Sequence, residues 1–384
     1  MKMSQNLQKG TDDTILHTSL ERYQRRRLYW TLMITASSLG LVFSIVFAIM
    51  FGSAGPFGPA STRIFSIFDV LREIGKNIIR PLLEFLNIPI SGSTDISKVI
   101  IWDIRLPRVI MGAFAGMALA VAGTVMQALF RNPMADPYII GLASGASVGA
   151  SIAIVAGGSL FFLAGYTLPI FAFGGALITI TIVYYISNIR GTISVDTLLL
   201  SGITVGSFMT AITSFLTYIS GEHLRPIVFW LMGGLSLVEG DWDSVLIAAM
   251  VIIPSCFLCL LLSRPLNLLL LGEESAQFRG LDVQKLRQLL LVLATLMTAI
   301  SVAFTGVIGF VGLIIPHLVR LITGPDHRIL LPVSALSGAS FLILADVVAK
   351  TIIYPTELPV GIITAFCGAP FFLYLLRKYK KTGY

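Results

Sequence analysis

Two cysteines have the CxxC spacing that occurs in metal and redox sites. They are Cys256 and Cys259, and both lie inside an apolar run. No second cysteine pair and no histidine close in sequence completes a ligand set, so neither kind of site is expected. His317 follows Ile314-Ile315-Pro316, and we interpret it as a packed or interfacial histidine rather than a ligand. These residues therefore predict no metal or redox chemistry.

Catalytic and nucleotide-binding motifs are absent from the sequence. It contains no GxxxxGKS/T phosphate-binding loop, no HExxH motif and no paired carboxylates. ATP binding through a P-loop is therefore excluded, and we expect neither an enzyme nor a bound cofactor. The apolar runs also lack the central Asp or Glu of a proton or sodium relay. If the chain moves a substrate, the energy must come from another subunit.

The most compact group of charged residues lies in a polar segment, residues 264–287, between two apolar runs. Gly272 opens a short stretch within this segment, and Gly280 closes it. Glycine on both sides of a short stretch is typical of helix ends. The charged residues of the stretch are Glu273, Glu274 and Arg279. We expect a short helix on a membrane surface that binds a soluble partner. A solvated loop without a partner is the alternative.

The chain as a whole has the composition of a membrane protein. It is 55% hydrophobic and 12% charged, with a mean hydropathy of +0.87, whereas soluble domains carry about 25% charged residues. We interpret the formal net charge of +7 as the positive-inside bias of membrane proteins rather than as a sign of nucleic-acid binding. The predicted fold class is an all-α polytopic protein embedded in the lipid bilayer.

Charge-free runs predict ten transmembrane helices. The run from Gln288 to Val319 spans roughly 32 residues, or about 48 Å of helix, which is too long for one crossing of a ~30 Å hydrocarbon core. We expect it to divide into two spans near Gly306, Gly309 or Gly312. The other expected spans are residues 28–51, 109–130, 138–157, 166–189, 197–220, 244–263, 329–345 and 358–376.

The distribution of basic residues predicts the orientation of the spans. An even number of spans places both termini on one side, and the clusters at Arg25–Arg27 and Arg377–Lys381 favour the cytoplasm. An amphipathic helix is expected near residues 66–86. The expected segments are a cytoplasmic head (1–27), a transmembrane domain (28–376) with a long extracytoplasmic loop (52–104) and a cytoplasmic loop (264–287), and a cytoplasmic tail (377–384).

Three cations are expected on the outer surface, where positive charge is normally scarce. Arg105 and Arg108 flank Pro107 at the start of the second span, and Lys350 follows the ninth. Because proline fixes its own backbone, both arginines should lie at the mouth of the span. An exposed cationic rim of this kind predicts an acidic partner or an anionic ligand.

Five sequence blocks closely resemble the FecCD-type permeases, the membrane subunits of ABC importers for iron-siderophores, heme and cobalamin. They occur in the family's order between about residues 102 and 377. The blocks are RLPR at 105–108 with QALFRNPMADP at 127–137, WLMGG at 230–234, LGEESA at 271–276, GFVGLIIPH at 309–317 and ELPVG at 357–361. The head and the loop up to residue 103 do not contribute to the resemblance.

The resemblance implies a ten-helix type II importer permease that forms a dimer, with a second copy or a paralogue, around a central translocation path. It implies that two cytoplasmic ABC ATPase subunits contact Gly272, Glu273, Glu274, Ser275, Ala276, Arg279, Gly280 and Leu281. It implies that an extracytoplasmic substrate-binding protein docks on Arg105, Arg108 and Lys350. It further implies a cytoplasmic gate at Asn132, Met134, Val195 and Asp196. Many members carry arginine at the position of Lys350. Lysine keeps the positive charge but cannot make the bidentate pairing of arginine with a carboxylate.

Two other functions remain open at this point. An ion-coupled secondary transporter would need no ATPase, but the missing carboxylates within the spans disfavour it. A membrane scaffold that transports nothing would show no uptake defect on deletion. The sequence does not identify the cargo among iron-siderophores, heme, cobalamin and other chelates.

Overall fold

The computed structural model describes residues 2–51, 68, 70–75, 99–156, 165–189, 192–236, 241–353 and 356–381. Almost all of them are helical, and the strands β1 (Asn188–Ile189) and β2 (Thr192–Ile193) form one short antiparallel hairpin. The α-helices are α1 (Lys2–Met50), α4 (Leu106–Leu129), α5 (Leu142–Val155), α6 (Thr167–Ser187), α7 (Val195–Ile219), α8 (Leu224–Leu231), α9 (Trp242–Leu261), α10 (Ser263–Leu269), α11 (Glu273–Phe278), α12 (Val283–Thr305), α13 (Val311–Thr323), α14 (His327–Thr351) and α15 (Val360–Lys381). Shorter helical turns are η1 (Val99–Arg105), η2 (Pro137–Ile140) and η4 (Gly221–His223).

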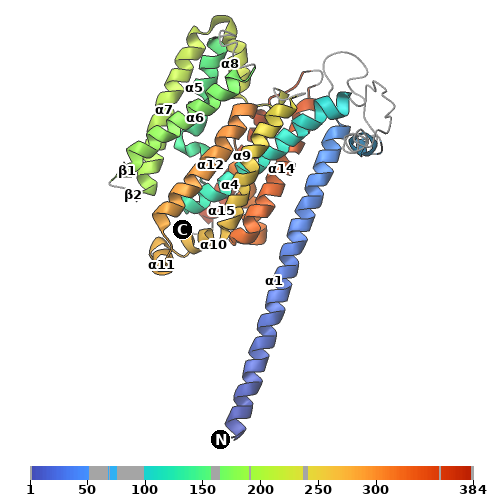
Figure 1. Ribbon diagram of the computed structural model, residues 1–384, viewed down its shortest axis with the longest axis vertical. Helices are drawn as coiled ribbons and strands as arrows, with labels where there is room; N and C mark the ends of the chain where they lie inside the picture. Colours follow the sequence, from blue (N-terminus) through green and yellow to red (C-terminus); the bar gives the residue numbers. More distant parts are fainter. Residues whose placement is uncertain are drawn as a thin grey trace, which may run out of the picture.

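Among the described residues, seven helices are long and apolar enough to cross a membrane, and three shorter helices are apolar. The shorter ones are residues 142–155, 311–323 and 360–375. Each of these helices falls on one of the ten expected spans, which confirms the predicted fold class. Figure 1 shows the long helices side by side, with α8 at one end of the bundle and α11 at the other. We call these the α8 end and the α11 end.

The predicted division of the longest apolar run is confirmed. α12 ends at Thr305, Gly306 follows with a φ of 66°, and α13 begins at Val311. A positive φ favours glycine because it has no Cβ to clash with the backbone. The break is packed against the segment after α8, because the Gly234 amide donates a hydrogen bond to the Thr305 carbonyl at 2.7 Å. The connection between α12 and α13 is therefore part of the bundle rather than a loose loop.

The helix α4 lies at the centre of the bundle. It packs against α14, α12, α13 and α9, and most of its side chains are buried. Small residues permit a close contact with α14, since a Cβ on Gly116 would come within 2.3 Å of the Gly338 carbonyl oxygen. Close backbone approach of this kind drives helix association in lipid, where the hydrophobic effect between helices is weak. The contact between Gly116 and Gly338 therefore holds α4 close to α14.

A side chain of α4 compensates for a proline in α13. Pro316 has no N–H, so the carbonyl of Gly312, four residues earlier, loses its partner within the helix. The Gln127 amide donates to the carbonyl oxygens of Gly312 at 3.5 Å and Leu313 at 3.2 Å. Arg320 in turn donates to the Gln127 Oε1 at 3.3 Å. This polar link joins α4 and α13 inside the bundle.

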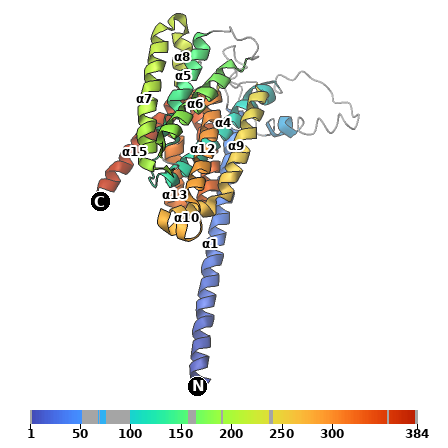
Figure 2. The same ribbon diagram turned by 60° about the vertical axis from the view of Figure 1, so that its left-hand side comes forward.

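The helix α1 lies at the edge of the bundle and extends far beyond its α11 end, as Figures 1 and 2 both show. It packs mainly against α14. Arg26 forms an ion pair with Asp326, which precedes α14. Burial alone would raise the pKa of Asp326, but hydrogen bonds from Arg328 and Asn267 lower it below its usual range. The pair therefore stays charged and anchors α1 to α14.

The expected loop 52–104 needs one correction. Residues 99–104 are helical and continue into α4 through η1, because Ile100 and Ile101 are buried against α1 and α14. Of the expected amphipathic helix at 66–86, residues 70–75 are helical. The rest of it lies mostly outside the described residues.

Candidate functional site

Four charged side chains meet at the α8 end, and the first pair joins α4 to α14. The Arg108 Nη2 atom lies 2.8 Å from the Asp346 Oδ1 atom. On the same α14, the Lys350 Nζ atom lies 2.9 Å from the Asp346 Oδ2 atom. Asp346 and Lys350 are four residues apart, so one helix face carries both. Asp346 thus holds one cation from each of two helices.

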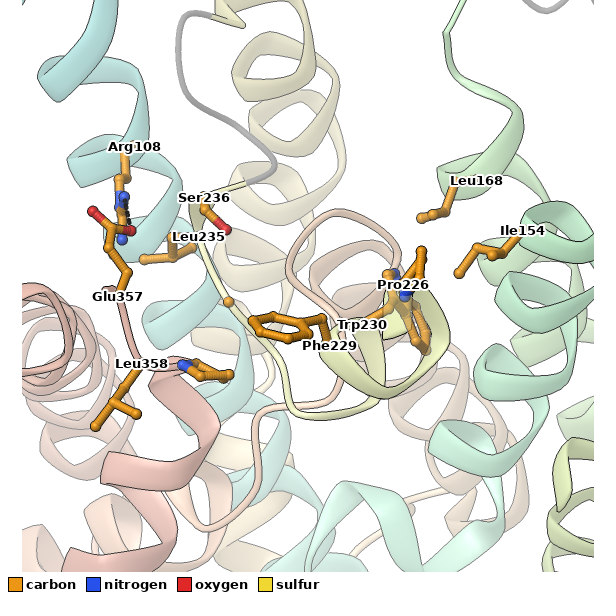
Figure 3. Close-up of a pocket in the computed structure, with 12 residues that line it drawn as sticks. Arg108, Ile154, Leu168, Pro226, Phe229, Trp230, Leu235, Ser236, Glu357 and Leu358 are labelled. Carbon is orange, nitrogen blue, oxygen red and sulfur yellow. Dashed lines mark hydrogen bonds and ion pairs between the residues drawn. The ribbon is translucent and has the colours of Figure 1, made fainter. Parts of the chain in front are cut away.

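The fourth charged side chain is Glu357, which lies just before α15. The Arg108 Nη1 atom lies 2.9 Å from the Glu357 Oε2 atom, and Figure 3 shows the two side chains facing each other. Two cations and two carboxylates leave the cluster with no net charge. Buried charges are tolerated when they are paired and hydrogen-bonded in this way. We call Arg108, Asp346, Lys350 and Glu357 the charge cluster.

The predicted exposed rim of cations is wrong. Arg105, Arg108 and Lys350 are each at most 3% exposed. Arg108 binds carboxylates in distant parts of the sequence, at Asp346 and Glu357, so counting charges near span ends did not reveal that pairing. Lys350 binds Asp346, four residues earlier on the same helix. In this structure all three side chains bind other parts of the chain.

Arg105 has a different role from the charge cluster. Its Nη1 atom donates to the carbonyl oxygens of Ile49 at 2.6 Å and Met50 at 3.2 Å. These are the last residues of α1, where carbonyl groups have no partner within the helix and carry partial negative charge. Arg105 therefore caps the end of α1 and ties it to the start of α4.

The expected short helix at the α11 end is present. α11 begins after Gly272, which has a φ of 109°. At its other end the Gly280 amide donates to the Gln277 carbonyl at 2.8 Å, and the Leu281 amide donates to the Ala276 carbonyl at 3.1 Å. This pair of bonds is the Schellman ending that a glycine with positive φ permits. The prediction that the two glycines bound a helix is confirmed.

The side chains of α11 divide into a buried group and an exposed group. Ala276 is buried, and the Glu273 carboxylate lies 2.7 Å from the Arg287 Nη2 atom and 3.4 Å from the Arg131 Nη2 atom. Glu273 therefore fixes α11 to α12 and to the end of α4. The exposed residues are Glu274, Ser275, Gln277, Phe278, Arg279 and Gly280.

Phe278 is a candidate residue that the sequence analysis missed. Its side chain is 91% exposed on α11, among polar neighbours. A large aromatic side chain in such a position is a typical anchor of a protein interface. The available signal was the single phenylalanine within the polar stretch from Glu273 to Gly280.

The expected gate residues lie in two segments at the α11 end. Asn132 and Met134 belong to the turn after α4, in which the Met134 amide donates to the Asn132 Oδ1 at 2.9 Å. Val195 and Asp196 begin α7, and Asn132 and Asp196 are both exposed. The turn continues into η2, which packs against α7. The structure thus brings the turn and α7 together through η2.

A groove with hydroxyl groups on its walls runs between α5 and α7. It is about 770 Å³ in volume near α8, and a second hollow of about 370 Å³ shares Ser144 and Thr210 with it. Thr210, Ser214 and Thr217 each donate to the carbonyl four residues earlier in α7. Their oxygen lone pairs remain available to the groove. The serine and threonine residues that line the larger hollow are Ser144, Ser147, Thr210, Thr213, Ser214 and Thr217. The signal in the sequence was the spacing of three or four residues between hydroxyls.

Comparison with known proteins gives a family match and close relatives. The model of the FecCD transport family matches residues 40–378. The "Cobalamin import system permease protein BtuC" of Halobacterium salinarum is 49% identical over 74% of this chain and 75% of its own length. The "Hemin transport system permease protein HmuU" of Yersinia pestis is 44% identical over 73% of this chain and 84% of its own. A solved structure, described as an inward-facing conformation of a metal-chelate type ABC transporter, has 32% identity and a TM-score of 0.74 over 91% of this chain and 99% of its own.

Proposed function

Since the chain belongs to the FecCD transport family and is a multi-pass permease subunit of an ABC importer, we propose that its cargo is a metal chelate. Iron-siderophores, heme and cobalamin are the candidates within this class. The sizes of the relatives' named cargoes, cobalamin and hemin, suit a wide path with weak contacts rather than a tight pocket. The chain itself is a transport component, and we infer that a separate partner hydrolyses ATP.

The observation that carries this proposal is the hydroxyl-lined groove between α5 and α7. Its hydroxyl oxygens can accept hydrogen bonds from the rim of a chelate, and each such neutral bond contributes little net free energy. A wall of this kind offers hydrogen bonds along the path but does not bind the cargo tightly. We propose that α5 and α7 line the translocation path, and that a second copy or a paralogue supplies the opposite wall.

We propose that two ABC ATPase subunits bind at the α11 end. The exposed side chains of Glu274, Phe278 and Arg279 offer a negative, an aromatic and a positive contact on one short helix. Glu273 is half exposed and already paired within the chain, so it would position α11 more than it would contact a partner. The α11 end would then be cytoplasmic, together with both termini, in a cell or inner membrane.

We propose that the turn at Asn132 and Met134 and the start of α7 at Val195 and Asp196 close the path on the cytoplasmic side. Their position at the α11 end supports this role. A substrate-binding protein would dock at the opposite, α8 end. Because the charge cluster is buried there, docking would use its surroundings, or would require Glu357 to release Arg108.

The test of the ATPase contact uses charge reversal on α11 in the reconstituted importer. We expect Glu274→Lys with Arg279→Glu to lower ATPase recovery and ATP-driven uptake of cyanocobalamin or hemin at least tenfold. Phe278→Ala should weaken ATPase binding by about 10- to 100-fold, because a buried aromatic side chain contributes roughly 1.5–3 kcal/mol. Lys285→Glu reverses an exposed charge outside α11 and should leave both measurements unchanged.

Two results would contradict the proposal. Normal ATPase recovery and uptake in the α11 variants would exclude α11 as the contact. Uptake that an ionophore abolishes while ATP is held constant would instead support a secondary transporter.

A further inference from the structure

Two arginines share one carboxylate and one aromatic ring where α1 meets the bundle. The Arg26 and Arg328 guanidinium groups lie 4.8 Å and 5.0 Å from the centroid of the Trp30 ring. Both also form ion pairs with Asp326, yet their side chains remain 56% and 43% exposed. Asp326 is the only hydrogen-bonding partner of the Arg26 side chain among the described residues. The Arg26 Nε and Nη1 atoms are therefore available to an external acceptor.

The neighbouring face of α1 combines a cation with apolar side chains. Four residues spaced three and four apart share this face, namely Arg25, Leu28, Tyr29 and Leu32. The Tyr29 hydroxyl donates to the Ile322 carbonyl at 2.8 Å, so the face borders the end of α13. Leu28, Leu32 and Ile322 are each more than half exposed, and we call them the apolar strip. An exposed cation therefore lies at one end of an exposed apolar surface.

The charges of this region do not balance. Asp326 is the one carboxylate that binds the four cations among the described residues, which leaves an excess of three positive charges. The cations are Arg25, Arg26, Arg27 and Arg328. Arg25 is exposed and makes no hydrogen bond or ion pair with any described residue. Because like charges repel one another, an anion among these arginines would lower the free energy.

The surroundings select the kind of anion. Leu28 and Leu32 belong to a helix that is long and apolar enough to cross a membrane, and Ile322 lies at the end of an apolar helix. In a bilayer the apolar strip contacts acyl chains, which places the arginines beside the headgroups. Trp30 and Tyr29 suit this level, because tryptophan and tyrosine are enriched at the membrane–water interface. A phosphate on apolar chains fits both parts of the surface, whereas a soluble anion would contact only the arginines.

We propose that Arg25 and Arg26 bind the phosphate of an anionic phospholipid whose acyl chains lie along the apolar strip. A guanidinium group suits a phosphate because it is planar and offers two parallel donors. The bound lipid connects α1, which lies at the edge of the bundle in Figure 1, to the end of α13. The inference depends on the chain lying in a bilayer and not on its cargo or its ATPase partner.

The test uses the full chain with its co-purified partners in nanodiscs of dioleoylphosphatidylcholine. The probe is phosphatidylglycerol that carries a photoreactive diazirine on one acyl chain, and labelled residues are mapped by peptide mass spectrometry. We expect saturable labelling within residues 25–32 and 321–323. Unlabelled phosphatidylglycerol should displace the probe at about a tenfold lower mole fraction than zwitterionic phosphatidylethanolamine, because each arginine near an anionic headgroup contributes to binding.

Two matched variants test whether this site or the total charge attracts the lipid. Arg25→Gln removes a cation from the face of the apolar strip, so phosphatidylglycerol should bind about three- to tenfold more weakly. Arg27→Gln removes the same charge from nearly the opposite face of α1 and should leave binding almost unchanged. Neither side chain has a polar partner among the described residues, so both variants should elute as the intact complex.

Several results would overturn the inference. Labelling that never saturates would show that no site exists, and unchanged binding by Arg25→Gln would remove Arg25 from it. An equal loss in the Arg25→Gln and Arg27→Gln variants would assign the attraction to diffuse charge. If phosphatidylethanolamine displaces the probe as well as phosphatidylglycerol does, the surface does not select a negative headgroup. Displacement by inorganic phosphate would identify a site for a soluble anion instead of a lipid.

Discussion

The two ends of the bundle use charged residues in opposite ways. At the α8 end, Arg108, Lys350 and Asp346 are buried and bind one another. At the α11 end, Glu274 and Arg279 are exposed on a helix that a Schellman turn closes. A charge that the chain already neutralises holds helices together, whereas an exposed charge is available to a partner. The charge cluster therefore stabilises the bundle, whereas Glu274 and Arg279 are the charges that we propose for recognition of a partner.

The strongest way to test this contrast is to remove the central carboxylate of the charge cluster. Asp346→Ala leaves Arg108 and Lys350 buried without their shared partner, so we expect a loss of about 3–5 kcal/mol of stability. Asp243→Ala, an exposed carboxylate at the start of α9, should stay within about 0.5 kcal/mol. Thermal unfolding can be followed by a thiol-reactive dye at the buried Cys256 and Cys259. Exposed Cys367 is replaced by serine in every variant.

A triple variant shows whether uncompensated charge is the cause. Arg108→Met, Asp346→Leu and Lys350→Met together remove the cations as well as the carboxylate, so the triple variant should be more stable than Asp346→Ala alone. If Asp346→Ala unfolds like the unmodified chain, the charge cluster does not stabilise the bundle, and the contrast between the two ends fails.

The second prediction concerns the cap on α1. Arg105→Met removes two charge-assisted hydrogen bonds to the Ile49 and Met50 carbonyls, and we expect a loss of about 1.5–3 kcal/mol. Hydrogen exchange should rise in the last turn of α1 and in η1, but not in α11. Arg225→Met removes an exposed arginine at the same end and should change neither stability nor exchange. Unchanged exchange at the end of α1 in Arg105→Met would show that the cap is unimportant.

Much of the fold follows from the sequence because the bilayer excludes charge. Among the described residues, charge-free runs located the seven long apolar helices and the three shorter ones, and the length of the run after Gln288 required a break, which Gly306 provides. Gly272 and Gly280 predicted the two ends of α11 correctly, because glycine is typical of helix ends. Each of these features depends on residues close together in the chain, so a single sequence contains enough information to place them.

The features that were missed depend on residues far apart in the chain. Arg108 binds carboxylates 238 and 249 residues away, and no local pattern links them. The Asp346 partner of Lys350 is only four residues away, but the burial of both side chains depends on the packing of α4 against α14, which brings together distant parts of the chain. Phe278 and the hydroxyl groove were missed for a different reason. Their residues are visible in the sequence, but the exposure of Phe278 and the grouping of the hydroxyls become clear only when the neighbouring helices are placed.

The smallest expected effect concerns Asp136, a partly buried carboxyl group at the α11 end. Asp136 lies in the turn after α4, where its Oδ1 accepts a hydrogen bond from the Tyr138 amide at 2.8 Å. Burial raises the pKa of Asp136 to about 6, although the Tyr138 bond acts in the opposite direction. The folded chain thus holds this proton more tightly than the unfolded chain does. Stability from this group is highest below about pH 4 and falls as the pH rises to about 6.

Asp136→Asn keeps the acceptor for the Tyr138 amide but never ionises, so it should remove this pH dependence. We expect the variant to match the unmodified chain at pH 4 and to exceed its stability by about 1 kcal/mol at pH 7.5. The full value of about 1.4 kcal/mol per pKa unit is not reached, because water contacts the half-buried carboxylate. Melting curves from tryptophan fluorescence at both pH values measure the difference, with Asp196→Asn as the exposed control. A stability gap that is equal at both pH values, or larger at pH 4, would show that Asp136 behaves like the exposed charges of this end.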